Sequence, residues 1–181
     1  MTDIALTQAI NGLAGRSGLL DQLLTWVSAF GVPAMIIAVA LQWWRRTERT
    51  AVRHVLVAAG LSFLLGQGLN QLILLFVHRV RPYDAGVSHL LIAPSADWSF
   101  PSDHATAAVA IAAAFLLHRM PRQGLVLLAA ALLIMFSRVY LGIHYAGDVA
   151  GGAVTGIAAA LLVKALYREG TRADRLVTGI L

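Results

Sequence analysis

The stretch SRVYLGIHYAGDV, residues 137–149, places an arginine, a histidine and a carboxylate at the spacing SR-x5-H-x3-D between two apolar segments. A histidine such as His144 can transfer protons or attack as a nucleophile near neutral pH. Asp148 follows four residues later, so on a helix it would share a face with His144, fix the imidazole tautomer and stabilise the imidazolium. Arg138 suits phosphate because a guanidinium donates paired hydrogen bonds to its oxygens. These residue types predict nucleophilic or proton-transfer chemistry at a phosphate group.

Two earlier segments, HRVRPYD and SFPSDHATA, carry further residues of the same chemical types. They contribute Arg79, Arg81, Ser102, Asp103 and His104. Ser102 stands where a helix N-cap belongs, directly after Pro101, and the free N–H groups of that first turn would make an anion site with the helix dipole. His104 adds a second group for proton transfer. If the three segments meet, they predict phosphoryl transfer through a phosphohistidine, with arginines neutralising the phosphate oxygens.

The segments between these motifs are apolar enough to cross a membrane. The chain has 181 residues, of which 59% are hydrophobic and 13% charged, and its mean hydropathy is +0.74, whereas a soluble domain carries about a quarter charged residues. The predicted spans are residues 22–44, 55–77, 103–118, 123–137 and 146–163. We expect an all-α integral membrane protein, a bundle of about five transmembrane helices in one domain over residues 1–181.

Two further patterns refine this bundle. Ile4, Leu6, Ile10 and Leu13 predict a short interfacial helix at the N-terminus. The spacings Gly147-x3-Gly151 and Gly152-x3-Gly156, which let helices approach closely, predict that the last span packs against the span at residues 103–118.

Basic residues indicate how the bundle is oriented. Ten of the 14 would lie on one side of a five-helix path: Arg45, Arg46, Arg49, Arg53, Arg119, Arg122, Lys164, Arg168, Arg172 and Arg175. By the positive-inside rule this side faces the cytoplasm, together with the C-terminus. The three motifs then face the periplasmic or extracellular side of the plasma membrane. Since topology accounts for the net charge of +5, no nucleic-acid partner is expected.

The third span is short, which places the motif at its start within the bilayer edge. The 17 residues from Ser102 to His118 would rise only about 25 Å as a helix, less than a hydrocarbon core of about 30 Å. Ser102 and His104 would therefore lie at or slightly below the headgroup boundary. A site at that depth favours a phosphate carried by a lipid.

Taken together, the motifs resemble the signature of the type 2 phosphatidic acid phosphatase superfamily, K-x6-RP, PSGH and SR-x5-H-x3-D, over about residues 70–148. The resemblance implies that His144 is the nucleophile, that Asp148 orients it, and that His104 protonates the leaving group. It further implies phosphate binding by Arg81, Ser102 and Arg138. Neither a metal nor another cofactor is implied, and the absence of cysteine excludes cysteine-ligated metals.

The sequence departs from this signature at two positions. Leu74 stands where the family has lysine, and Asp103 replaces the glycine of PSGH. One hypothesis is that Arg79 supplies the missing cation, while residue 103 keeps its backbone N–H near the phosphate and adds a carboxylate. The pairing of HxRP with PSDH, the small size and an N-terminal NGLAG stretch resemble the undecaprenyl-diphosphate phosphatase branch of the superfamily.

This resemblance implies a metal-independent phosphatase that converts undecaprenyl diphosphate to undecaprenyl phosphate at the outer membrane face, a step in bacterial cell-wall biogenesis. Phosphatidylglycerophosphate, phosphatidate and a lipid A phosphate remain alternative substrates. A lipid-to-lipid phosphotransferase would use the same residues, and a non-catalytic transporter or scaffold is a third class. The sequence makes no prediction of the oligomeric state.

Overall fold

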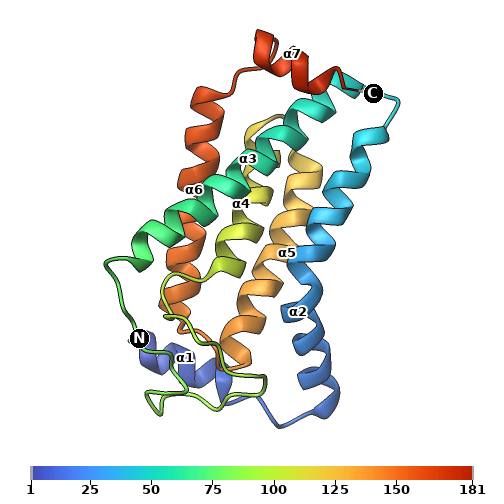
Figure 1. Cartoon of the computed structure of the whole chain (residues 1–181). Coiled ribbons are helices and arrows are strands. Elements are labelled where there is room, and N and C mark those ends of the chain that lie inside the picture. The colour runs from blue at the N-terminus through green and yellow to red at the C-terminus, as the bar shows by residue number, and fades with distance from the viewer. Residues whose placement is uncertain (1, 181) are drawn as a thin grey trace.

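The computed structural model describes residues 2–180 and contains only helices and irregular segments over that range. The helices are α1 (Asp3–Asn11), α2 (Gly18–Ala40), the 3-10 helix η1 (Leu41–Trp44), α3 (Arg49–Leu74), α4 (Asp103–Leu117), α5 (Pro121–Tyr140), α6 (Ala146–Leu166) and α7 (Arg172–Thr178). Helices α2 to α6 form an elongated bundle, with α1 across one end and α7 at the other (Figure 1). The predicted all-α bundle with a short N-terminal helix is confirmed.

Four segments are long and apolar enough to cross a membrane, namely Gly18–Trp44, Arg49–Leu74, Pro121–Tyr140 and Ala146–Leu166. The protein is therefore a multi-pass membrane protein. Helix α3 begins at Arg49 rather than at the predicted residue 55, because its first turns continue beyond the charge-free window. There the guanidinium of Arg53 is buried and donates to the carbonyl of Thr178, the last residue of α7, at 2.8 Å.

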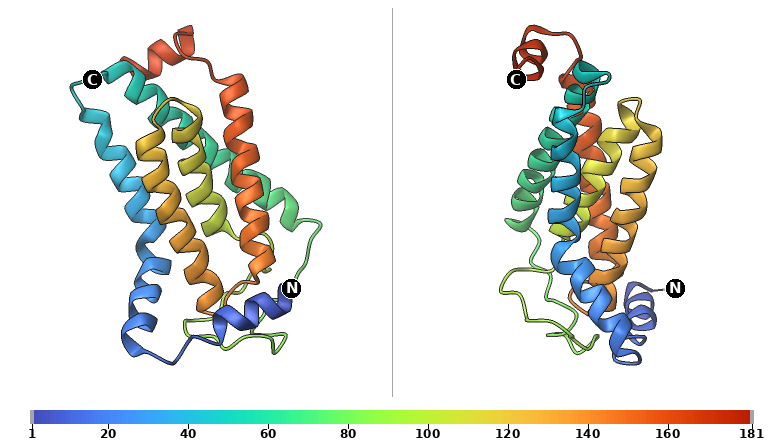
Figure 2. Two further views of the ribbon diagram at one scale, coloured as in Figure 1. Left: turned by 180° about the vertical axis from the view of Figure 1, so that it is seen from behind. Right: turned by 90° about the vertical axis from the view of Figure 1, so that its right-hand side faces the viewer.

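The remaining bundle helix, α4, is shorter than the other four and occupies the centre of the bundle. It has 15 residues, which corresponds to about 22 Å, and it packs against α3, α5 and α6 (Figure 2). Its sequence is rich in alanine and most of its side chains are buried, including Phe115. Because α4 is enclosed by longer helices, its N-terminal end lies inside the bundle instead of at its rim.

Small residues bring α6 against α4. A Cβ atom at Gly152 would lie 2.5 Å from the carbonyl oxygen of Ser102, and one at Gly156 would lie 2.7 Å from that of Thr106. Both distances are shorter than any tolerable contact, so only glycine permits this approach. The predicted packing of the last span against the 103–118 segment is confirmed, and it sets the start of α6 beside the start of α4.

Helix α1 lies across the end of the bundle where α4 and α6 begin (Figure 2). Its side chains at Ile4, Leu6 and Leu13 are exposed, as expected of an interfacial helix, but Ile10 packs inward against Tyr140 and Leu141. The predicted apolar face is therefore divided between the protein and its surroundings. The long segment between α3 and α4 runs along this same end (Figure 1).

Candidate active site

A cavity of about 100 Å³ lies at the N-terminal end of α4 and collects residues from all three motifs. It is lined by Leu74, Arg81, Ser95, Asp97, Trp98, Pro101, Asp103, His104, Arg138 and His144. Both predicted histidines and two of the predicted arginines therefore face one small space. They come from the loop after α3, the start of α4, the end of α5 and the α5–α6 loop.

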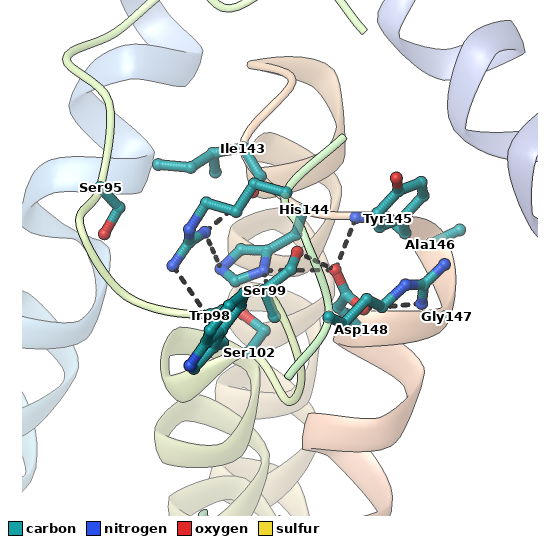
Figure 3. Close-up of polar contacts among 12 residues, drawn as sticks. Ser95, Trp98, Ser99, Ser102, Ile143, His144, Tyr145, Ala146, Gly147 and Asp148 are labelled. Carbon is teal, nitrogen blue, oxygen red and sulfur yellow. Dashed lines mark hydrogen bonds and ion pairs between the residues drawn. The ribbon is translucent and has the colours of Figure 1, made fainter. Parts of the chain in front are cut away.

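His144 lies in the short loop between α5 and α6 and is 3% exposed. The chain turns at Gly142 with φ +78°, where a Cβ atom would lie 2.3 Å from the carbonyl oxygen of His89, so the turn requires glycine. The Nδ1 atom of His144 lies 2.8 Å from the carbonyl oxygen of Ser99 (Figure 3). Only a protonated Nδ1 can donate to a carbonyl, so in the neutral ring Nε2 carries a lone pair. That atom lies 3.5 Å from Nη1 of Arg81.

Burial and two nearby cations keep this imidazole uncharged. Burial lowers the pKa of His144, and the positive charges of Arg138 and Arg81 lower it further, while Asp148 acts in the opposite direction. The net effect is a pKa below the usual histidine value of 6.5. A neutral imidazole whose Nε2 carries a lone pair is the form required of a nucleophile.

Asp148 supports His144 less directly than the sequence spacing predicts. His144 precedes the N-cap Tyr145, so the two residues do not share a helical face. The closest approach, Asp148 Oδ2 to His144 Nδ1, is 3.6 Å, which is too long for a hydrogen bond. Oδ2 instead accepts from the Ser99 hydroxyl at 2.5 Å and from the N–H of Tyr145 at 2.9 Å. Asp148 thus fixes Ser99, whose carbonyl orients the imidazole, and adds a negative charge beside the ring.

Ser99 is a residue of this site that no sequence motif marked. It is fully buried, and its hydroxyl and carbonyl connect Asp148 to His144. Its only signal was a serine two residues before Pro101, which lies outside the family signature.

Arg81 is held against His144 by an extensive set of hydrogen bonds. Its Nη1 donates to the carbonyl of Ile143 at 2.9 Å, and its Nη2 donates to Oδ1 of Asp97 at 2.7 Å. Burial alone would raise the pKa of Asp97, but hydrogen bonds from Ser95 and Arg81 hold it below its usual value. Asp97, which no motif marked, therefore pairs its carboxylate with Arg81, a residue predicted to bind phosphate.

Two buried polar atoms near the cavity have no hydrogen-bond partner among residues 2–180. They are Nε of Arg138 and Oγ of Ser102. Arg138 is anchored at its other end, where Nη1 donates to Ser28 of α2 at 2.6 Å. Ser102 is the N-cap of α4, as predicted, but its hydroxyl makes no capping bond. Since buried polar groups are nearly always paired, these two donors fit an anion bound beside them.

His104 and Asp103 form the first turn of α4 and both line the cavity. The added carboxylate of Asp103 accepts a hydrogen bond from the amide of Asn70 at 2.7 Å, and that amide also contacts Thr106 at 2.9 Å. Leu74 lines the same cavity, so the position of the family lysine does face the site and is apolar here.

Arg79, which the sequence suggested as a replacement for the missing cation, is not among the residues that line the cavity. Its Nη1 donates to Oδ1 of Asp148 at 2.8 Å, and its Nη2 donates to Oδ2 of Asp3 at 2.5 Å. The guanidinium also lies over the ring of Tyr145, 3.7 Å from the centroid. Arg79 is therefore engaged by Asp148, Asp3 and Tyr145. Within the described residues, no group of three or more metal-ligating side chains lies close enough to hold a metal ion.

The fold and this geometry define a class: helical membrane proteins with two histidines and two arginines gathered around a small anion-sized cavity at one end of the bundle. The PAP2 superfamily matches this chain over residues 55–172. The undecaprenyl-diphosphatase BcrC of Bacillus subtilis is 37% identical over 150 residues, covering 83% of this chain and 76% of that protein. The chain belongs to the PAP2 superfamily, and it is a membrane phosphatase that hydrolyses phosphoric esters.

Solved structures show the same fold. The first PAP2-type phosphatidylglycerolphosphate phosphatase from Bacillus subtilis superimposes with a TM-score of 0.68 and 26% identity, over 94% of this chain and 86% of that one. Aquifex aeolicus LpxE superimposes with a TM-score of 0.65 and 26% identity, over 88% of this chain and 93% of that one. The arrangement of the bundle is therefore that of PAP2 membrane phosphatases.

Proposed function

We propose that this protein removes the terminal phosphate of undecaprenyl diphosphate and releases undecaprenyl phosphate, using His144 as nucleophile. The observation that carries the reaction is the placement of His144, whose Nδ1 is held by the Ser99 carbonyl while the ring faces a cavity shared with Arg81, Arg138 and His104. The choice of substrate rests on the similarity to the undecaprenyl-diphosphatase of Bacillus subtilis.

In the first step, the terminal phosphate enters the cavity and its oxygens accept hydrogen bonds from Arg81, from Nε of Arg138 and from the Ser102 hydroxyl. Nε2 of His144 attacks phosphorus and forms a P–N bond, while the P–O bond to the lipid phosphate breaks. His104, at the first turn of α4, gives its proton to the departing oxygen. Preorganised donors that stabilise charge in the transition state supply much of the rate enhancement in such reactions.

The second step returns the enzyme to its starting state. His104, now neutral, takes a proton from water, and the resulting hydroxide attacks the phosphorus of phosphohistidine. The P–N bond breaks, inorganic phosphate leaves, and His144 regains its lone pair. No metal or other cofactor takes part in this scheme, because two arginines and the helix N-terminus neutralise the phosphate.

We also propose that the site faces the outer side of the plasma membrane and that the C-terminus is cytoplasmic. The basic residues after α6 and between α2 and α3 lie at the end of the bundle opposite the cavity, and the positive-inside rule assigns that end to the cytoplasm. The exposed apolar side chains of α1 suit the headgroup region at the site end.

One release assay tests this proposal against its alternatives. The purified chain is incubated with a panel of lipid mono- and diphosphates in EDTA, and inorganic phosphate is measured. We expect the fastest release from undecaprenyl diphosphate, unaffected by EDTA. Faster release from phosphatidylglycerophosphate would favour the activity named for the Bacillus subtilis structural neighbour. Release only when a second lipid is present would instead identify a phosphotransferase.

Variants separate catalysis from a scaffold role. His144→Ala should abolish release, whereas His89→Ala serves as the matched control, because His89 lies at the same end of the bundle but outside the cavity. If the unmodified chain and His144→Ala behave alike on every lipid phosphate, the catalytic assignment is wrong.

A further inference from the structure

The N-terminal helix α1 contacts the backbone on both sides of the loop that carries His144. At the start of α6, Oδ1 of Asp3 accepts from the N–H of Gly147 at 2.7 Å, and the Thr7 hydroxyl accepts from the N–H of Ala146 at 3.0 Å. At the end of α5, the amide of Asn11 donates to the carbonyl of Tyr140 at 2.8 Å. A segment near the N-terminus therefore holds both ends of the loop.

The residues of α1 that make these contacts form one polar stripe. Asp3, Thr7 and Asn11 are spaced by four and so share a helical face. Thr7 and Asn11 are buried, 0% and 6% exposed. The first N–H groups of a helix have no partner within it, and Asp3 with Thr7 supplies partners to two of those of α6. The position of α6, and with it Asp148, is thereby coupled to α1.

Arg79 links this stripe to Asp148 itself. Asp148 is fully buried, and a buried carboxylate without a compensating charge is strongly destabilised. Arg79 donates to Oδ1 of Asp148, leaving Oδ2 for Ser99 and the N–H of Tyr145. Its other nitrogen is held by Asp3. The order Asp3, Arg79, Asp148, Ser99, His144 is thus a continuous set of polar contacts ending at the proposed nucleophile.

We propose that Arg79 and Asp3 are positioning residues, which use α1 to hold Asp148 and the His144 loop in the reactive arrangement, and that Arg79 is not a phosphate ligand. The inference rests on the proposed function of His144. Arg79 is outside the cavity, two of its nitrogens are bonded to carboxylates, and Tyr145 covers one face of its guanidinium. Arg81 and Arg138, which do line the cavity, are the proposed phosphate ligands.

Kinetics on the purified full chain test this role with undecaprenyl diphosphate as substrate. For Arg79→Gln we expect kcat to fall about 10–100-fold, because small misplacements of reacting groups have effects of that size, while KM changes by less than about threefold. Arg79→Lys should recover part of kcat, since lysine retains the charge beside Asp148 but cannot bridge both carboxylates. The exposed Arg16, at the same end of the bundle, provides the control Arg16→Gln.

A double-mutant cycle tests the participation of α1. Asp3→Asn should lower kcat with KM nearly unchanged. Combining it with Arg79→Gln should cost less than the product of the two single effects, because both changes break the Asp3–Arg79 ion pair. Asp84→Asn, at an exposed loop carboxylate, is the matched control. If Arg79→Gln does not fold, the comparison of Asp3→Asn with Arg79→Lys still measures kcat against KM.

Each outcome supports or overturns the inference. A large rise in KM for Arg79→Gln with unchanged kcat would make Arg79 a substrate contact. If the effects of Asp3→Asn and Arg79→Gln multiply independently, then α1 does not position Asp148 through Arg79. Unchanged kinetics in all three variants would dismiss the positioning role while leaving the proposed function intact, whereas failure of the unmodified chain to release phosphate from any lipid would overturn the proposed function itself.

Discussion

The two ends of the bundle each contain a buried histidine–aspartate pair, and the pairs differ in geometry and surroundings. At the end with α7, Nδ1 of His54 lies 2.8 Å from Oδ1 of Asp174, whereas at the cavity end His144 and Asp148 are 3.6 Å apart. The tighter pair is the one outside the family signature. A short histidine–carboxylate distance is therefore not what distinguishes a reactive site in this protein.

What distinguishes the cavity end is an arginine in contact with the imidazole and a second arginine with an unpaired donor. The ring of His54 is stacked on Tyr167, with centroids 4.7 Å apart, and contacts His118 edge-on. It borders a cavity of about 700 Å³ in which Glu48 and Glu169 lie among basic residues. Asp174 also accepts from the Tyr167 hydroxyl at 2.6 Å, so this pair attaches α7 to the bundle. The His144 cavity also holds both signs of charge, from Arg81, Arg138, Asp97 and Asp103, but there Nη1 of Arg81 lies 3.5 Å from Nε2 of His144 and Nε of Arg138 is unpaired.

The largest expected difference comes from removing each histidine in turn. His144→Ala should reduce kcat by at least about 10⁴-fold, as loss of a nucleophile does in other covalent enzymes. His54→Ala should keep turnover per folded molecule within about threefold, because its contacts hold α7 and not the site. Phosphate release, normalised to folded protein from size-exclusion chromatography in detergent, measures both. Equal losses would remove the distinction between the two ends.

The second largest difference is expected between substitutions of arginines at the two ends of the bundle. Arg138→Gln should lower kcat/KM about 10²–10³-fold, which is the effect of losing a donor that stabilises transition-state charge. Arg168→Gln is the matched control, since Arg168 is exposed beside α7. If Arg138→Gln retains most activity, then the unpaired Nε of Arg138 is not a phosphate donor.

For stability, in contrast to activity, we expect a clear effect of a substitution at the α7 end. Asp174→Asn removes the charged acceptor shared by His54, Tyr167 and the N–H of Gly170, and it should lower the free energy of unfolding by about 1–3 kcal/mol. Burial raises the pKa of Asp174, but hydrogen bonds from Tyr167 and His54 outweigh it and the net pKa is lowered. A lowered pKa stabilises the folded state above the unfolded-state pKa and ceases to do so as pH falls through the folded value.

The stabilising effect of Asp174 should therefore be lost in the acid range, below pH 4. Thermal unfolding in detergent, compared between Asp174→Asn and the unmodified chain at several pH values, checks this. The gap between the two should close as pH falls. A gap that stays constant would show that hydrogen bonding, and not charge, accounts for the loss.

The smallest expected effect is a shift of the pH profile. His144 must be neutral to attack, so kcat/KM should be lost as pH falls through its pKa, which burial, Arg138 and Arg81 hold below 6.5 despite the opposing charge of Asp148. Arg81→Gln removes one of these cations and should move the acid limb of the residual activity to higher pH, by less than about one unit. A shift to lower pH would contradict the assignment of the acid limb to His144.

Much of the fold could be predicted from the sequence because membrane helices are marked by patterns among residues close together in the chain. Long apolar windows, a serine and proline before α4 and the glycine spacing of α6 depend on residues close together in the chain, and each matched the structure. The motif residues Arg81, His104, Arg138 and His144 line one cavity, although their catalytic roles stay predictions.

Other features depended on contacts between distant segments, which no local period encodes. Asp3 accepts a hydrogen bond from the N–H of Gly147, and Arg79 donates one to Asp148. Asp97 accepts one from Arg81. Each of these residues lies in a loop or terminal helix whose path is set by packing at the end of the bundle. The geometry of His144 relative to Asp148 belongs here too, because it depends on where α6 begins.

By itself, the sequence determined a helical membrane bundle and the chemistry available at its motifs, since apolar length and residue type act through local physical chemistry. Only the tertiary structure decided which arginine faces the cavity, which carboxylate holds which donor, and that Ser99 stands between Asp148 and His144. The reason is that a buried charge takes the nearest partner in space, and that partner is set by the docking of α1 and the loops onto the bundle, not by spacing along the chain.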